Sequence, residues 1–283
     1  MRRKGIKKAV SIVLVLMLLL NMLPMTALAN DENTEYVYLT ASYDGKFLED
    51  KNGNPVAHVQ VPLAALEEID LNNYGLSEYL YDKDGDGEYE VTALHLDIYI
   101  HEVICGQSWD SVTVEGSPGS IYFNGGLFGY ETANLRYDYN GAFPVDEEMS
   151  ELYGYTWGAT ADRIVLKDGD FIDVGSYSCW QFYGDSATGF YHFADEKLNI
   201  EHSFDADTET ALDVKLIRSY SDWNDNGNAA KEPTADFTVY YGKTLGNVEG
   251  SVTTDSEGIA NINFPEEGTW YLWCDGGRGI DEW

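Results

Sequence analysis

The stretch TALHLDIYIHEVIC, Thr92–Cys105, decides whether this chain carries a helix among its strands. Its apolar residues recur at helical spacing, so that Leu94, Ile98 and His101 share one face. Gly106 follows the run directly, and glycine commonly ends helices because it adopts left-handed backbone angles without strain. We therefore expect a helix over this stretch.

Short strands surround the expected helix on both sides. Upstream, Tyr36–Ala41 alternates in the manner of a strand, Asp44-Gly45 is a hairpin-turn signal, and Val56–Leu63 reads as another strand. Downstream, Arg163–Leu166 and Phe171–Val174 flank an Asp-Gly pair that predicts a tight turn between two strands. The chain is therefore expected to be mainly β, of the α+β class.

The C-terminal part begins after the polar run Asp205–Thr210. Alternating segments follow at Leu212–Ile217, Phe237–Tyr241 and Gly268–Trp273, which is the pattern of a small β-sandwich. We expect one domain over residues 30–204 and a sandwich module over residues 205–283. The sandwich is either short or truncated before its closing strand, and we favour truncation.

Residues 1–29 have the order of a secretory signal peptide. Five basic residues lie within Arg2–Lys8, an apolar run spans Ala9–Leu20, and Thr26–Ala29 is a small-residue cleavage pattern. The apolar run is shorter than the ~20 residues that span a bilayer. We expect a secreted, extracellular protein, associated with the cell surface or free, that does not insert into the membrane after cleavage.

The chain is strongly acidic, with a formal net charge of −32. The signal peptide carries five of the 17 basic residues and none of the 49 acidic ones, so cleavage changes the net charge to −37. Such a surface repels nucleic acid and anionic membranes, which excludes both as partners. An aromatic content of 14% argues against disorder. The three cysteines, Cys105, Cys179 and Cys274, leave any disulfide pairing open.

Three motifs in residues 117–175 carry a resemblance to a known family. They are Arg136–Gly141 (RYDYNG), Trp157–Asp162 (WGATAD) and Leu166–Asp173 (LKDGDFID). In this order they resemble the DUF4430 family of bacterial secreted and surface proteins, which is similar to the C-terminal β-domain of transcobalamin. The resemblance implies a β-grasp-like domain, preceded by an N-terminal hairpin, with one helix on a mixed sheet.

Residues 212–273 resemble bacterial Ig-like stalk modules, chiefly through the run at 254–271. Together the two resemblances imply a non-catalytic binding or adhesion protein of a Gram-positive bacterium. A corrinoid (cobalamin)-binding surface protein is the first alternative, although the helical barrel that completes such sites is absent from this sequence. A secreted glycoside hydrolase or other carbohydrate-active protein is the second.

An acidic segment has part of the spacing of a calcium-binding loop. Asp82, Asp84 and Asp86 occupy positions 1, 3 and 5 of an EF-hand loop, a glycine stands at position 6, and Glu88 follows. Position 12, where a bidentate acid belongs, is Ala93. The segment therefore predicts either a weak calcium site or a solvated acidic turn.

Motifs of nucleophilic catalysis are missing from the sequence. It contains no G-x-S-x-G elbow, no glycine-rich phosphate loop and no C-x-x-C pair. His101-Glu102 is not followed by the second histidine of a zinc-protease helix. We expect a protein that is not an enzyme.

Aromatic residues are the remaining candidates for binding. They are concentrated between positions 122 and 157, in glycine-rich segments, and aromatic faces stack on sugars and on flat cofactors. The alternative is that they form the core of the domain. The residues predicted to contact a small-molecule or glycan ligand are Tyr122, Phe128, Tyr130, Tyr139 and Trp157.

Overall fold

The computed structural model describes residues 34–131, 134–178, 189–206, 210–222, 225 and 227–274. The protein is mainly β, with 39% strand and 17% helix, as the sequence predicts. The predicted signal peptide, residues 1–29, and Cys179 lie outside the described residues. From Glu35 onward the described residues belong to one compact unit, Glu35–Trp283.

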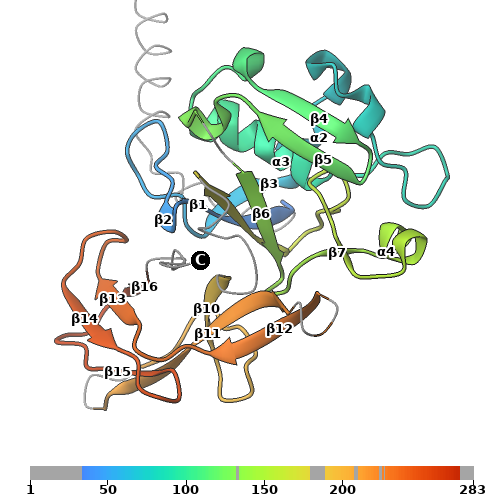
Figure 1. The fold of residues 1–283 in the computed structure, drawn as a ribbon. Coiled ribbons are helices and arrows are strands. Elements are labelled where there is room, and N and C mark those ends of the chain that lie inside the picture. Colours follow the sequence, from blue (N-terminus) through green and yellow to red (C-terminus); the bar gives the residue numbers. More distant parts are fainter. Residues whose placement is uncertain are drawn as a thin grey trace, which may run out of the picture. The chain divides into compact units, whose positions relative to one another are not determined.

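The first sheet is mixed (Figure 1). Its strands are β1 (Tyr36–Tyr43), β2 (Lys46–Phe47), β3 (Val59–Pro62), β6 (Asn134–Tyr139) and β9 (Phe171–Tyr177). The order is β2-β1-β9-β6, and β3 pairs with β1 beside β2. Strands β1 and β9 run parallel, whereas the other pairs are antiparallel. The hairpin signal at Asp44-Gly45 is confirmed, because the turn there joins β1 to β2.

Helical segments are short and few in the described part of the chain. The α-helices are α2 (Leu63–Glu67), α3 (Ala93–Tyr99) and α4 (Glu147–Tyr153). A π-helical turn, η4 (Ile100–Ile104), continues α3, so the predicted helix over Thr92–Cys105 is confirmed. Gly106 takes a φ of 67° at its end. The 3-10 turns are η2 (Leu71–Tyr74), η3 (Ser77–Tyr79), η5 (Trp109–Ser111) and η6 (Leu127–Gly129).

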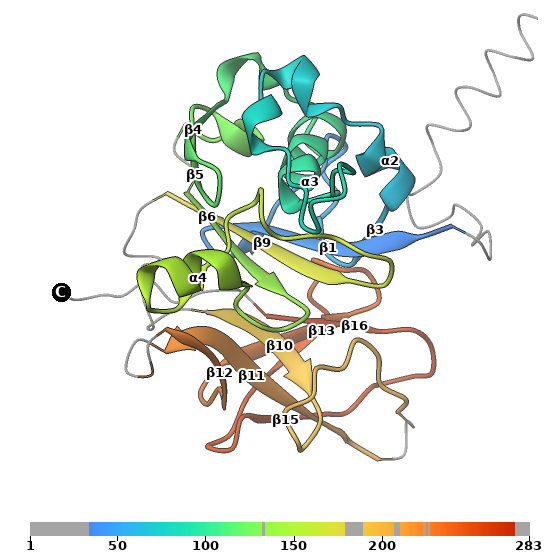
Figure 2. The same ribbon diagram turned by 90° about the vertical axis from the view of Figure 1, so that its right-hand side faces the viewer.

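Helix α3 packs on one face of the first sheet (Figure 2). Leu94 and Ile98 from the helix join Leu39 from β1 and Ile172 from β9 in one buried cluster. Each buried side chain of this size contributes about 1.5–3 kcal/mol through the apolar surface it removes from water. This helix-covered core therefore fixes the first sheet and leaves its other face available for a second layer.

Two antiparallel sheets make up the C-terminal part. Their strands are β10 (Phe190–Ala194), β11 (Leu212–Asp222), β12 (Asn228–Pro233) and β15 (Ile259–Ile262) in one, and β13 (Thr238–Gly242), β14 (Gly250–Thr253) and β16 (Tyr271–Trp273) in the other. Val214 and Leu216 from the former pack against Val239 from the latter. Strand β10 precedes the predicted boundary at residue 205 and pairs with β11, which follows it.

Two predicted strands differ from the structure. Arg163–Leu166 is not the partner of Phe171–Val174, because β1 and β6 occupy both edges of β9. Its backbone instead bonds to the region where α3 begins, with Leu166 N–H donating to the Val91 carbonyl. The strand predicted at Val56–Leu63 is shortened to β3, since His58 has a φ of 52° and Leu63 starts α2.

Two small hairpins complete the fold. Strands β4 (Thr113–Ser117) and β5 (Ser120–Asn124) pair on either side of the glycine-rich turn. Strands β7 (Val145–Asp146) and β8 (Trp157–Gly158) flank α4. Neither hairpin joins the larger sheets.

Candidate functional site

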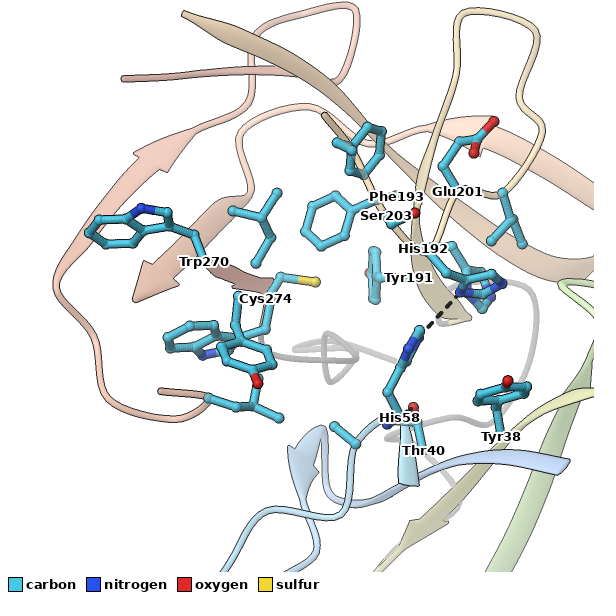
Figure 3. Close-up of a pocket in the computed structure, with 18 of the residues that line it drawn as sticks. Tyr38, Thr40, His58, Tyr191, His192, Phe193, Glu201, Ser203, Trp270 and Cys274 are labelled. Carbon is cyan, nitrogen blue, oxygen red and sulfur yellow. Dashed lines mark hydrogen bonds between the residues drawn. The ribbon is translucent and has the colours of Figure 1, made fainter. Parts of the chain in front are cut away.

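A cavity of about 1010 Å³ lies between the first sheet and the C-terminal sheets (Figure 3). Strands β1 and β9 line one side of it. Strands β10 and β16, with the segments 200–206 and 264–274, line the other. The cavity is the candidate site because it is concave and is lined by aromatic and ionisable side chains together.

Strand alternation explains how the first sheet supplies both a core and a cavity wall. Successive side chains of a strand point to opposite faces, so Leu39 and Ala41 of β1 enter the helix-covered core. Tyr38 and Thr40 then point into the cavity, as Figure 3 shows. Phe171 does the same from β9, beside Tyr38.

Aromatic rings stack across the cavity wall. The Phe171 ring lies 4.6 Å from the Tyr38 ring and 3.5 Å from the His202 ring, nearly parallel to both. On the opposite side, Phe264 and Trp270 lie 5.4 Å apart between ring centres. Further aromatic lining residues are Phe190, Tyr191, Phe193, Phe204, Tyr271 and Trp273. The wall thus presents several flat apolar faces.

Apart from histidine, the charged residues of the lining are acidic. They are Asp173, Glu201, Asp205, Glu266 and Glu267, and no lysine or arginine is among the described lining residues. Lys243 lies beside this wall, where it pairs with Glu266 and holds its ammonium 5.3 Å from the Trp270 ring. The cavity therefore attracts cations. The Trp270 ring already has a cation, the Lys243 ammonium, beside it.

Two histidines form a pair at the cavity. His58 and His202 are joined by a hydrogen bond of 3.2 Å between ring nitrogens, the dashed line in Figure 3. Burial lowers the pKa of His58, and the charge of His192 lowers it further. Burial and the two neighbouring histidines lower the pKa of His202 to about 4. At neutral pH both imidazole rings are therefore uncharged. A neutral ring has a nitrogen lone pair that can accept a hydrogen bond or bind a metal ion.

A third histidine lies between two carboxylates. His192 of β10 places Nε2 3.4 Å from Asp138 Oδ2 and Nδ1 3.5 Å from Asp173 Oδ2. Asp138 and Asp173 are direct cross-strand partners in β6 and β9. We call these three residues the Asp-His-Asp cluster. It connects the first sheet to the C-terminal part.

The Asp-His-Asp cluster shifts its own ionisation. Burial disfavours charged His192, but the neighbouring Asp138 and Asp173 outweigh that effect, so the pKa of His192 is raised. Burial raises the pKa of Asp173 to about 6; Asp138 adds to the increase, and His192 opposes it. At neutral pH the cluster therefore favours a carboxylate–imidazolium arrangement.

A glycine permits the close approach of a neighbouring segment to the cavity. Gly141 has a φ of 74°, and a Cβ at this position would overlap Cδ1 of Ile200. Both residues line the cavity. The positive φ favours glycine here, and a side chain at this position would also displace the end of the Ile200 side chain.

None of the five aromatic residues predicted to bind a ligand is among the described residues that line the cavity. Tyr122 is 54% exposed on the β4–β5 hairpin, where its hydroxyl donates to Glu115. Phe128 is buried in the helix-covered core. Tyr130 stacks on Tyr43 with 3.5 Å between ring centres.

Tyr139 and Trp157 have separate partners. The Tyr139 hydroxyl donates to Asp170 at 2.6 Å. Trp157 stacks on Tyr153 at 4.8 Å and lies 5.8 Å from Tyr155, and both tyrosines are about half exposed. We call Tyr153, Tyr155 and Trp157 the aromatic platform; it is the second surface on which a ligand can stack.

The acidic loop predicted to bind calcium is organised around Asp82. Its carboxylate accepts the backbone N–H groups of Gly85, Asp86 and Gly87. Asp84 and Glu88 are exposed, and Glu88 N–H donates to Asp86. Among the described residues, the Asp-His-Asp cluster is the group of donors that converges within 4.8 Å, and the acidic loop does not form one. Calcium binding there stays a prediction.

Sequence reasoning missed the cavity and its histidines. Alternation in Tyr36–Tyr43 indicated a strand, but it gave no reason to ask what its second face contacts. His58, His192 and His202 are more than 130 residues apart at the extremes, and His192 reaches Asp138 only across two sheets. The sequence did contain one signal of this site: an aspartate, Asp173, within the otherwise apolar predicted strand Phe171–Val174.

The comparisons with known proteins give no match. No family model, no curated protein and no solved structure matches it. The resemblance to the DUF4430 family therefore stays a prediction. Within the described ranges, no helix has the length and apolarity needed to cross a membrane.

Proposed function

We propose that the protein is an exported, non-catalytic binding protein whose cavity takes a small organic ligand with a flat apolar face and a positive charge. The observation that carries this proposal is the lining: stacked aromatic rings with five acids, and no lysine or arginine among its described members. Cations bind over aromatic faces, most strongly over tryptophan, and carboxylates at the rim complete such sites. The net charge of −37 that remains after cleavage of the expected signal peptide attracts a cationic ligand from a distance.

The finer fold assignment supports the same role. We propose that the first sheet and α3 form the β-grasp-like domain and that the C-terminal sheets form the Ig-like module. The mixed sheet with its parallel β1–β9 pair favours the first assignment, and the two antiparallel sheets that share a core favour the second. In this arrangement the module supplies one wall of the cavity.

A ligand titration with a matched pair of probes tests the proposal. Choline and its uncharged carbon isostere have the same shape, so a difference between them measures the contribution of charge. We expect a panel of quaternary and aromatic ammonium compounds that includes choline to raise the melting temperature of residues 30–283 more than the uncharged isosteres do. Equal or absent effects from both sets would refute the proposal, and cobalamin in the same assay tests the corrinoid alternative.

Two variants locate the binding. Trp270→Ala removes a cavity ring and is expected to weaken ammonium binding by roughly tenfold, the equivalent of about 1.4 kcal/mol. Trp157→Ala removes a ring of the aromatic platform and is the matched control, with unchanged affinity expected. The reverse result places the site on the platform and rejects the cavity.

Glycan binding at the aromatic platform is the second candidate. Tyr153, Tyr155 and Trp157 expose neighbouring rings beside α4, and the indole N–H is already bonded to the Gly119 carbonyl, which fixes the ring. Fixed aromatic faces stack on sugars at little entropic cost. An oligosaccharide that loses binding in Trp157→Ala and retains it in Trp270→Ala supports this candidate.

A further inference from the structure

The Asp-His-Asp cluster presents a problem of charge in the fold. Asp138 and Asp173 lie directly opposite one another on adjacent strands and point to the same face of the first sheet. Like charges at directly opposite positions of a sheet repel and destabilise it. A cation between the two carboxylates removes the repulsion.

The burial of Asp138 sharpens the problem. Asp138 is 1% exposed, and neither of its carboxylate oxygens has a hydrogen bond. Its charged partner is His192, at 3.4 Å. A buried carboxylate without hydrogen bonds is costly unless it is paired or coordinates a metal. His192 Nε2 faces Asp138 as an ion pair without hydrogen-bond geometry, so the pairing of this buried carboxylate is incomplete.

The separations among the donors fit a small divalent ion. Oxygen and nitrogen ligands bind zinc at ~2.0–2.2 Å in a tetrahedron, which places neighbouring ligand atoms about 3.3 Å apart. One donor atom from each of Asp138, Asp173 and His192 lies within 4.8 Å of the other two. The contacts of 3.4 Å to Asp138 and 3.5 Å to Asp173 are made by different nitrogens of the His192 ring, so a single nitrogen serves both carboxylates only after the donors draw together around the ion.

A further group orients the cluster. Thr40, the neighbour of Asp173 in the parallel pair with β1, hydrogen-bonds to the Asp173 side chain. The Thr40 hydroxyl also accepts the backbone N–H of His58 at 3.3 Å. Metal-ligating carboxylates are commonly held by such outer hydrogen bonds.

We propose that Asp138, Asp173 and His192 bind one divalent transition-metal ion of the zinc type. One imidazole and two carboxylates form a borderline donor set that suits zinc or manganese better than calcium, which takes six or more oxygens. Asp173 and His192 line the cavity, so the fourth position of the ion opens toward it. The ion joins the first sheet to β10, and it does not depend on the organic ligand proposed above.

Metal titration of residues 30–283, stripped with chelator and free of any organic ligand, tests the proposal. We expect zinc to bind at one equivalent with a dissociation constant on the order of micromolar or tighter, and calcium to compete poorly. His192→Gln and Asp173→Asn are expected to weaken zinc binding on the order of 100-fold, and Thr40→Val by about 10-fold. Glu201→Gln, an acid of the same cavity, is the matched control and should leave zinc binding unchanged.

The histidine pair is the competing location for zinc. A double variant, His58→Gln with His202→Gln, should retain binding if the Asp-His-Asp cluster holds the ion. The proposal would be overturned if zinc binding were lost in this double variant and retained in His192→Gln. It would also be overturned if the wild-type chain bound no zinc at about 100 μM. In that last case His192 is an imidazolium that serves only to pair with the aspartates.

A measurement on the wild-type protein covers the case in which a variant does not fold. Crystals soaked in zinc are expected to show anomalous scattering at the zinc edge between Asp138, Asp173 and His192. A peak at His58 and His202, at the acidic loop or nowhere would contradict the proposal.

Discussion

Histidines in the helix-covered core and histidines in the cavity wall have different kinds of hydrogen-bonding partner. Histidines of the core have backbone partners: Thr92 N–H donates to His95 Nδ1 at 3.1 Å, and Phe128 N–H donates to His101 Nδ1 at 2.9 Å. Histidines of the cavity have side-chain partners: His58 bonds to His202, and His192 lies between two aspartates. A backbone partner fixes one tautomer, whereas an ionisable partner leaves the ring open to protons, ligands and metals.

From this difference we expect the core histidines to contribute to stability and the cavity histidines to contribute to binding. His101 is fully buried, and since its Nδ1 accepts a hydrogen bond, its Nε2–H donates to the Ser108 carbonyl at 3.0 Å. His202 is exposed apart from the stacking of its ring on Phe171. Removal of a histidine should therefore affect stability in the core and binding at the cavity.

The largest expected effect is that of His101→Ala. The substitution leaves a cavity in the core and breaks the bonds to Phe128 N–H and the Ser108 carbonyl, at a cost of roughly 3–4 kcal/mol of unfolding free energy. Urea unfolding followed by tryptophan fluorescence measures it. His58→Ala is the matched comparison, and a loss as large there would break the distinction between core and cavity.

The second effect is an acid sensitivity that comes from His95. Burial lowers its pKa in the folded protein from 6.5 to about 4. Between these pH values the unfolded chain binds a proton that the folded chain does not, so stability falls as the pH is lowered from 6.5 to 4. The loss approaches about 3 kcal/mol at pH 4 and is absent above pH 6.5.

Unfolding free energies of wild type and His95→Gln from pH 7.5 to 4 test this effect. Glutamine retains an acceptor for the Thr92 N–H and does not titrate, so the slope of stability against pH should be shallower in the variant. Comparison of slopes removes the contribution of the carboxylates, which both proteins share. Parallel curves would show that His95 is protonated equally easily in the folded and unfolded states.

The smallest expected effect is that of His202→Gln on stability. It removes one ring stack and one hydrogen bond at an exposed position, for which we expect a cost of about 0.5–1 kcal/mol. Thermal unfolding at pH 7 gives the value, with His101→Ala in the same series. If His202→Gln lost as much stability as His101→Ala, the His58–His202 pair would be a structural element of the fold.

The sequence predicted local structure where a single segment carried the signal. The helical spacing of Leu94 and Ile98, ended by Gly106, gave α3 and its continuation, and the Asp-Gly at position 44 gave the β1–β2 turn. The prediction failed for Arg163–Leu166, because the identity of a strand's neighbour depends on which edges distant strands already occupy. Phe128 failed for a related reason, since an aromatic residue in a glycine-rich segment can equally well be buried.

By itself the sequence determined the acidic charge, the mainly β class and the expectation of a binding protein without a catalytic motif. These follow from composition and from periodicity over a few residues, which do not depend on the rest of the chain. Tertiary structure alone decided that Asp138, Asp173 and His192 meet, because strand pairing and sheet packing join residues up to 54 positions apart. The cavity likewise exists only where two layers face one another, and no local pattern encodes the second layer.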